Sequence, residues 1–418
     1  MSERSNPDGR ADWVGVLDRV GHDLLVELPG LVSLSRDELM ETASGTTGFS
    51  DFGPDDFIEP LDILLTSLAT ESKLTLLGRI LVRADLLNLL QNRLRIADLT
   101  KREPAVLDEK IESPLFVIGL PRSGTTILHE LLATDPRLRA PLTWEARFPC
   151  PPASGETDQP DPRIGAADRF FDLQNHLVPG FETIHEVGGR LPCECIDLTA
   201  HSFRSEDFLA RQQTPSYGAW LASADLGPAY HYHRLLLQVL KWSQGSERWV
   251  LKAPSHMSAI AFLLAEYPDA CIVHTHRDPL QSMASAESLL TALISMRARE
   301  VDTELIKLGF AGEGLLSRLN AVIEARERHP NQAARFHDVR FSNLMQAPID
   351  TLRGIYEHFS MEFGAQDEER IRSYLASKPR GKHGRHAYRV EDLNIDAAQE
   401  RDRFRAYQQR YSVPSETS

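Results

Sequence analysis

The residues best suited to chemistry in this sequence follow a short apolar segment at residues 115–118. The next turn, Gly119-Leu-Pro-Arg-Ser-Gly124, is followed by a stretch with helical spacing. A strand, a glycine-bearing turn and a helix N-terminus direct backbone N–H groups at one anion, and the helix dipole adds roughly half a positive charge there. The stretch therefore predicts a phosphate-binding loop that comprises Arg122, Ser123, Gly124, Thr125 and Thr126.

The loop differs from a Walker A motif at its lysine position. Gly119 and Gly124 have the Walker spacing, but Thr125 stands where that motif has lysine, and the cation lies inside the loop, at Arg122. A nucleoside triphosphatase needs the lysine on the β- and γ-phosphates and a Mg²⁺ ion beside it. We therefore expect this loop to bind a 5′-phosphate whose outer group is neutralised by Arg122, with no metal ion.

Cations also follow two further apolar segments. Residues 249–251 and 270–275 have the residue types of buried strands, and Lys252 and Arg277 come just after them. Strands that alternate with helices form a parallel sheet, whose ligands bind beyond the carboxyl ends of the strands. We therefore expect these two cations and Arg122 to converge on one edge of a sheet, where they would bind an anion.

The segment Pro121-Arg-Ser-Gly-Thr-Thr126 resembles the 5′-phosphosulfate loop of sulfotransferases that use 3′-phosphoadenosine-5′-phosphosulfate (PAPS). The resemblance is to the bacterial branch with arginine in the loop and, to a lesser extent, to the tyrosylprotein enzymes. It implies that Arg277 and Ser285, eight residues apart, bind the 3′-phosphate of PAPS. It also implies that Lys252 stabilises charge on the oxygen that bridges the sulfur and the leaving phosphate.

Two residues are candidates for the base that removes the proton of the acceptor. Glu145 lies beside Trp144, where partial burial would raise its pKa toward that of a general base. The resemblance supports Glu145, because branches with a carboxylate base place a glutamate shortly after the loop helix. His256, four residues after Lys252, is the alternative.

Two later segments resemble the family's remaining nucleotide contacts. The segment Val339-Arg-Phe-Ser-Asn-Leu344 is similar to one with an aromatic residue near the adenine, which implies that role for Phe341. Residues 378–386 concentrate cations and glycines and resemble the Arg-Lys-Gly loop that closes over the 3′-phosphate. The candidates there are Arg380, Lys382 and Arg385.

The rest of the chain predicts the elements that position these residues. We expect an α/β fold, with a P-loop-like parallel sheet flanked by helices and an N-terminal α-helical annex. The expected organisation is a disordered tail at 1–11, the annex at 12–110, and a sulfotransferase-like α/β domain at 111–418 with a helical insertion near 164–245. A fourth strand is predicted at 331–339.

The insertion also contains a segment that is expected to border an acceptor pocket. His185 and residues 190–202 lie between its predicted helices. The aromatic residues of the insertion would supply either core packing or an apolar wall for an acceptor.

Composition limits the class of partner and the compartment. The net charge of −14 argues against a general nucleic-acid or anionic-membrane binder. We see no apolar run long enough for an integral membrane segment, and the polar first ten residues do not suggest a signal peptide. The four cysteines are expected to be reduced thiols in a cytoplasmic protein.

These features predict a PAPS-dependent sulfotransferase that acts on the hydroxyl of a small, apolar alcohol or phenol. Glu145 or His256 would remove the proton, while Arg122 and Lys252 balance the developing charge. A P-loop small-molecule kinase is one alternative, but it would need the Walker lysine and Mg²⁺. A non-catalytic nucleotide-binding protein is another. Neither the acceptor's identity nor the oligomeric state follows from the sequence.

Overall fold

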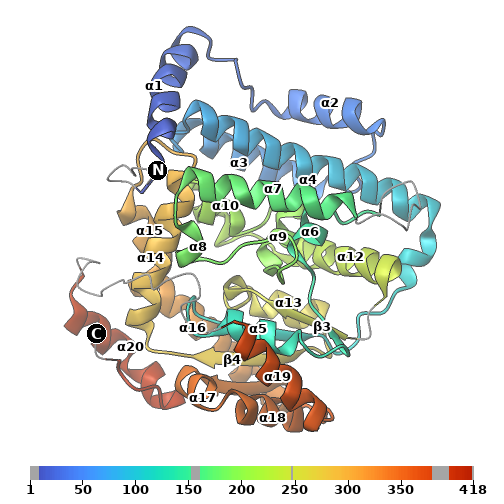
Figure 1. Cartoon of the computed structure of the whole chain (residues 1–418), viewed down its shortest axis with the longest axis vertical. Helices are drawn as coiled ribbons and strands as arrows, with labels where there is room; N and C mark the ends of the chain where they lie inside the picture. Colours follow the sequence, from blue (N-terminus) through green and yellow to red (C-terminus); the bar gives the residue numbers. More distant parts are fainter. Residues whose placement is uncertain (1–8, 152–160, 246–247, 379–394, 417–418) are drawn as a thin grey trace.

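A five-stranded parallel sheet forms the centre of the computed structural model, which describes residues 9–151, 161–245, 248–378 and 395–416. The strands are ordered β2-β3-β1-β4-β5, and all neighbours run parallel. Their bounds are β1 (Leu115–Gly119), β2 (Leu138–Arg139), β3 (Arg248–Lys252), β4 (Cys271–His276) and β5 (Phe336–Arg340). This sheet, flanked by helices, confirms the predicted α/β class (Figure 1).

The central strand β1 pairs with β3 on one side and with β4 on the other. Leu115 lies opposite Val250 and Cys271, and Gly119 lies opposite Thr275. All of β1 is buried, as its apolar side chains predict for a strand covered on both faces. Because these three strands are parallel neighbours, the turns that follow them meet at one edge of the sheet.

Helices account for most of the described chain. In the N-terminal part these are α1 (Asp12–Glu27), α2 (Arg36–Thr47), η1 (Asp55–Phe57), α3 (Ile58–Thr70), α4 (Leu76–Arg102) and η2 (Pro104–Asp108). Between β1 and β3 they are α5 (Thr125–Leu132), α6 (Thr143–Arg147), α7 (Pro162–Leu177), α8 (Phe181–Ile184), α9 (Cys195–Thr199), η3 (Ala200–Ser202), α10 (Asp207–Arg211), α11 (Pro215–Leu221) and α12 (Gly227–Gln244).

The later helices surround the remaining strands. They are η4 (Pro254–His256), α13 (Ile260–Glu266), α14 (Pro279–Ser295), α15 (Thr303–Phe310), α16 (Gly312–Arg328), η5 (Pro330–Arg335), α17 (Phe341–Gln346), α18 (Pro348–His358), α19 (Ala365–Ser377) and α20 (Ala397–Tyr411).

Two apolar clusters cover the two faces of the sheet. One contains Phe116 and Leu251 from the strands, with residues of α12, α13, α16 and α20. The other contains Val117 and Val250, with residues of α5, α17, α18 and α19. Neighbouring residues along each strand therefore belong to opposite faces, as the two-residue side-chain repeat of a strand requires.

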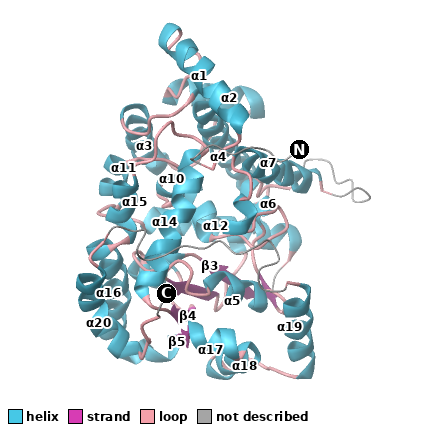
Figure 2. Ribbon diagram, turned by 60° about the vertical axis from the view of Figure 1, so that its left-hand side comes forward, coloured by secondary structure: helices cyan, strands magenta, loops and turns pink. Residues whose placement is uncertain are grey.

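The helices α1 to α4 lie together at the end of the molecule opposite α17 to α19 (Figure 1). Leu61, Leu64 and Leu90 of these helices share one apolar cluster with Phe203 and Tyr217. Figure 2 shows α3 beside α11, in agreement with this cluster. The N-terminal helices therefore pack against the helical insertion, and Ile96 and Leu99 near the end of α4 also join the apolar cluster that contains Phe116 of β1.

Three details differ from the sequence predictions. Residues 331–335 form the 3-10 helix η5 instead of strand, because Pro330 at its start lacks the backbone donor of a sheet ladder and favours a helical turn. The short strand β2 was not predicted. Arg10 and Ala11, assigned to the disordered tail, are buried, and the Ala11 N–H donates to the Leu177 carbonyl oxygen (3.0 Å).

Two further findings concern membrane spans and the cysteines. Within the described ranges, no helix combines the length and apolarity needed to cross a membrane. The four cysteines, all of which lie in described segments, are free thiols.

Candidate active site at the carboxyl edge of the sheet

The loop between β1 and α5 contains residues with positive φ angles. Arg122 and Gly124 have positive φ angles of 62° and 90°. Gly119 has a φ of 152°, and a Cβ atom there would lie 2.1 Å from Oγ1 of Thr275, so only glycine fits between β1 and β4. Ser123 is buried, and its hydroxyl donates to a carbonyl oxygen of the same turn (2.6 Å). The Ser123 side chain therefore holds the turn together.

Lys252 reaches the loop from the end of β3. Its side chain is buried, and its Nζ atom lies 3.4 Å from Oγ1 of Thr126, in the first turn of α5. The second partner of Lys252 is the carboxylate of Glu194, which immediately precedes α9. The predicted cation Lys252 and the predicted loop residue Thr126 thus lie together. The carboxylate of Glu194, which sequence analysis did not single out, lies beside Lys252.

Glu194 and His185 are ionisable groups close to Lys252. Burial opposes the charge on Glu194, but the attraction of Lys252 outweighs it and lowers the pKa of this carboxyl. Burial also lowers the pKa of His185 to about 4, although Glu194 acts in the opposite direction. At neutral pH Glu194 is therefore ionised and His185 is uncharged.

Sequence analysis contained a partial signal for these two residues. Both fall in the segments that were expected to border an acceptor pocket. The partner of Glu194 was not visible, because Lys252 lies 58 residues further along the chain and no local spacing links them.

Arg277 lies directly beyond β4 and contacts the loop between β1 and α5. Its Nη1 atom donates to the carbonyl oxygen of Arg122 (2.9 Å), and its guanidinium lies 4.2 Å from the ring centroid of Phe341. A Cβ atom added to Gly124 would lie 3.0 Å from that ring. The Nε and Nη2 atoms of Arg277 donate to the carboxylate of Glu416 (2.8 and 2.7 Å). The predicted clamp arginine, the loop and the predicted adenine neighbour therefore form one group.

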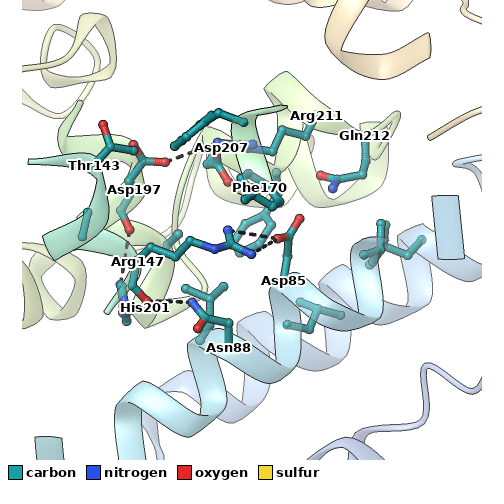
Figure 3. Close-up of a pocket in the computed structure, with 18 residues that line it drawn as sticks. Asp85, Asn88, Thr143, Arg147, Phe170, Asp197, His201, Asp207, Arg211 and Gln212 are labelled. Atoms are coloured by element: carbon teal, nitrogen blue, oxygen red, sulfur yellow. Dashed lines mark hydrogen bonds and ion pairs between the residues drawn. The ribbon is translucent and has the colours of Figure 1, made fainter. Parts of the chain in front are cut away.

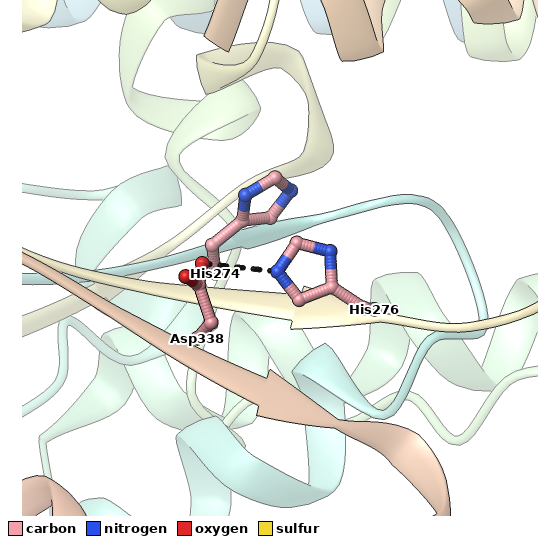
Figure 4. Close-up of side chains that lie close together, drawn as sticks. All are labelled: His274, His276 and Asp338. Carbon is pink, nitrogen blue, oxygen red and sulfur yellow. Dashed lines mark hydrogen bonds and ion pairs between the residues drawn. The ribbon is translucent and has the colours of Figure 1, made fainter. Parts of the chain in front are cut away.

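His274, His276 and Asp338 form a cluster on β4 and β5, next to Arg277 in the chain (Figure 4). Their ligand atoms lie within 4.8 Å of one another, a spacing compatible with a metal ion. However, the guanidinium of Arg326 donates to both oxygens of Asp338 (2.7 and 3.0 Å), which puts a positive charge where the ion would bind. His276 in turn lies 3.0 Å from Asp338. We interpret the bonds of Asp338 to Arg326 and His276 as a support for the end of β4, whereas neither ring nitrogen of His274 has a hydrogen-bond partner among the described residues.

The other predicted nucleotide contacts are placed as follows. Thr125 begins α5 and is buried. Ser285 is also buried and lies on the second turn of α14. Arg380, Lys382 and Arg385 lie outside the described residues.

The two predicted bases make contacts that the fold itself requires. Glu145 is 1% exposed. One of its oxygens pairs with Nη2 of Arg139 (2.5 Å), and the other accepts a backbone N–H at the start of α6 (2.8 Å). His256 is buried, its Nδ1 atom lies 2.7 Å from the hydroxyl of Tyr230, and burial holds its pKa well below the ordinary value. Both side chains are therefore held by partners within the fold.

A small polar pocket lies on the helical side of this site, between α4, α6, α9 and α10 (Figure 3). Its volume is about 70 Å³. Asp85 pairs with Arg147 (3.3 Å), and Nε of Arg211 donates to Asp207 (2.6 Å). Burial, reinforced by Asp207, raises the pKa of Asp197 to about 7. The pocket is therefore lined by paired charges, and these include Asp197, the carboxyl with the raised pKa, which pairs with Arg211 (3.3 Å).

Comparison with known proteins identifies the class of this protein. Residues 114–365 match the family model described as "Sulfotransferase family". The match covers more than half of the chain, and the chain belongs to the sulfotransferase family. It is a sulfotransferase enzyme, as the loop resemblance predicted.

Particular relatives come from mycobacteria. The solved structure of sulfotransferase STF1 from Mycobacterium tuberculosis H37Rv is 31% identical, with a TM-score of 0.76 over 90% of this chain and 99% of that one. Sulfotransferase STF9 from Mycobacterium avium is 29% identical, with a TM-score of 0.78 over 92% and 99%. The omega-hydroxy-beta-dihydromenaquinone-9 sulfotransferase Stf3 of Mycobacterium bovis is 25% identical over 308 residues, 68% of this chain and 72% of the relative. The predicted P-loop-like fold is confirmed by the two structures.

Proposed function

We propose that this sulfotransferase moves the sulfuryl group of PAPS to the hydroxyl of a small-molecule alcohol or phenol, without a metal ion. The observation that carries the proposal is the position of Lys252, which contacts both Thr126 at the loop helix and the carboxylate of Glu194. A cation and an ionised carboxylate thus stand beside a phosphate-binding loop. The name of the Mycobacterium bovis relative, which acts on an omega-hydroxy quinone, supports a hydroxyl acceptor. The free cysteines support a cytoplasmic location.

The donor would bind along the edge formed by the turns after β1 and β4. The 5′-phosphosulfate would accept hydrogen bonds from the N-terminal amides of α5, whose dipole favours an anion. The 3′-phosphate would bind Arg277 and Ser285, and the adenine would stack near Phe341. Arg277 already lies 4.2 Å from the centroid of that ring, which supports a shared nucleotide site.

The reaction would be an in-line transfer. As the acceptor oxygen attacks the sulfur, its proton passes to a carboxylate and the bond between sulfur and the bridging phosphate oxygen breaks. Adenosine 3′,5′-bisphosphate leaves with the electron pair of that bond. Lys252 would stabilise the negative charge on the bridging oxygen, and Arg122 the charge on the sulfuryl oxygens.

We propose Glu194 as the base in place of Glu145 or His256. Glu194 is 24% exposed at its side chain, so it remains accessible to an acceptor, whereas the side chain of Glu145 is 1% exposed. It is ionised at neutral pH, which a base requires. When Lys252 turns to the bridging oxygen, the paired carboxylate is released to accept the proton.

Paired variants test this assignment. We expect Glu194→Gln to lower kcat by about 10²- to 10⁴-fold, the usual contribution of a general base. Its affinity for adenosine 3′,5′-bisphosphate, measured by calorimetry without metal, should stay near that of the wild type. Glu145→Gln is the matched carboxylate control. We expect this variant to have a lower melting temperature than the wild type but a kcat close to that of the wild type.

One result would contradict Glu194 as the base, and a different result would contradict PAPS as the donor. A large loss of kcat in Glu145→Gln together with near-normal turnover in Glu194→Gln would return the role of base to Glu145. If the wild type failed to bind the bisphosphate but bound ATP with Mg²⁺, PAPS would not be the donor.

A further inference from the structure

A cavity lies between α10, α11, α14, α15 and α16, and nothing in the reaction above uses it. Its volume is about 580 Å³, within the range of small-molecule binding sites. Leu209, Leu290, Ile294, Ile306 and Phe310 supply much of its apolar wall. At the rim, Leu308 is 74% exposed. Contact of an apolar side chain with water is unfavourable, and an apolar ligand would reduce it. The cavity therefore suits an apolar molecule that enters past α15.

One helix connects this cavity with the proposed base. Glu194 immediately precedes α9, and Thr199, the last residue of α9, lines the cavity. A helix of five residues is about 7 Å long. Tyr230 makes a second link, because it lines the cavity and its hydroxyl lies 2.7 Å from His256, four residues after Lys252.

Gln212 gives the cavity an unused polar group. It lines both the apolar cavity and the small polar pocket of Figure 3. Its Oε1 atom is buried and has no hydrogen-bond partner among the described residues. A buried acceptor without a donor is costly unless a ligand or water supplies one. A ligand in the cavity with a hydroxyl or N–H group would satisfy it.

We propose that this cavity binds the apolar body of the sulfate acceptor, which is an uncharged alcohol with a long hydrocarbon chain. The inference rests on the proposed function, because it assigns the hydroxyl end to the site beside Glu194 and Lys252. The separation along α9 requires the hydroxyl and the buried part of the chain to lie about 7 Å apart. Short alcohols cannot reach both places and should be poor acceptors.

A cavity-filling variant tests the binding site without relying on turnover. Gly309 lines the cavity, and a Cβ atom built on it would meet no described atom within 4 Å beyond its chain neighbours and the nearby backbone of its own helix. We expect Gly309→Trp to fill the mouth and to weaken binding of the neutral dye Nile red at least tenfold by fluorescence titration. Gly45→Trp is the matched control: Gly45 is also helical and open but lies on α2, and its variant should bind the dye as the wild type does.

A chain-length series tests the identity of the ligand. With PAPS as donor, we expect kcat/KM to rise at least 100-fold from 1-butanol to 1-dodecanol, because each buried methylene adds favourable transfer free energy. Gly309→Trp should remove most of that rise. The affinity of each variant for adenosine 3′,5′-bisphosphate, measured separately, reports on the donor site.

Two results would overturn the inference. Equal dye binding by the wild type and Gly309→Trp would show that the cavity does not hold an apolar ligand. A kcat/KM that did not depend on chain length would show that the acceptor does not use it. If bisphosphate binding were also absent, the proposed function would fail with it, whereas intact bisphosphate binding confines the failure to the acceptor.

Discussion

The carboxylate of Glu416 forms a two-point hydrogen-bonded pair with the guanidinium of Arg277, with distances of 2.8 and 2.7 Å. The backbone N–H of Glu416 also donates to the carboxylate of Asp278 (2.7 Å), and Arg401 donates to the carbonyl oxygen of Glu416 (3.3 Å). Planar carboxylates and phosphates use the same fork of an arginine. Glu416 therefore binds the guanidinium of Arg277, the group that we propose binds the 3′-phosphate of the donor.

The first prediction is that the carboxylate of Glu416 and the 3′-phosphate of the donor compete for Arg277. Glu416→Gln should bind adenosine 3′,5′-bisphosphate about 3- to 10-fold more tightly than the wild type, because the phosphate no longer displaces an ion pair. Calorimetric titration measures the change. Glu313→Gln is the control, since Glu313 forms a different ion pair, with Arg403 of α20. Weaker binding by Glu416→Gln would mean that the carboxylate orients Arg277 for the phosphate.

The second prediction concerns the charge that Lys252 supplies. Lys252→Met should lower kcat by about 10²- to 10³-fold, the usual effect of removing one donor that stabilises transition-state charge. Lys241→Met changes a lysine of α12 that donates to a backbone carbonyl, and it should leave steady-state turnover within about twofold. Near-normal turnover by Lys252→Met would contradict the assigned role.

The third prediction concerns pH. The base must be ionised to act, so activity is lost as the pH falls through the pKa of the base. Lys252 lowers the pKa of Glu194, which places the acid limb of kcat/KM below the ordinary glutamate value of about 4.3. In Lys252→Met the opposing effect of Lys252 is lost and burial is opposed only by His185 and His129, so the acid limb of the residual activity should move to higher pH. An acid limb that did not move would exclude Glu194 as the base.

The fourth prediction concerns the loop backbone. Gly119→Ala should lower the free energy of unfolding by about 2–4 kcal/mol, since its Cβ atom would lie 2.1 Å from Thr275 Oγ1 at a φ of 152°. Gly45→Ala, in an open helical position, should instead stabilise by up to about 1 kcal/mol. Urea denaturation of both variants measures the difference. A neutral Gly119→Ala would mean that the loop is free to move.

Local patterns were sufficient to predict the central sheet. The apolar segments 115–118, 249–251 and 270–275 became β1, β3 and β4, because buried parallel strands are continuous apolar runs bounded by turns. The parallel order then brought Arg277 to the turn that contains Arg122. These steps need only residue types, spacing and the rules of βαβ connection.

The contacts between distant segments could not be predicted in the same way. Glu194 sits in an irregular stretch before a five-residue helix, and its pairing with Lys252 depends on how the whole insertion packs on the sheet. Glu145 had a suitable sequence context, but its pairing with Arg139 follows from the unpredicted strand β2. Side-chain partners of this kind are fixed by tertiary packing, which a single sequence does not encode locally.

The strand order also has a consequence for how the enzyme is made. Leu115 of the central strand pairs with Val250 and Cys271, more than 130 residues later in the chain. Pairing across such separations carries a loop-closure entropy cost before any contact forms, so folding is slow and local structure forms first. During synthesis, β1 therefore emerges long before either neighbour and remains an apolar, unpaired strand while the insertion is made. We expect the nascent protein to depend on chaperones over this interval, and the catalytic edge to form late.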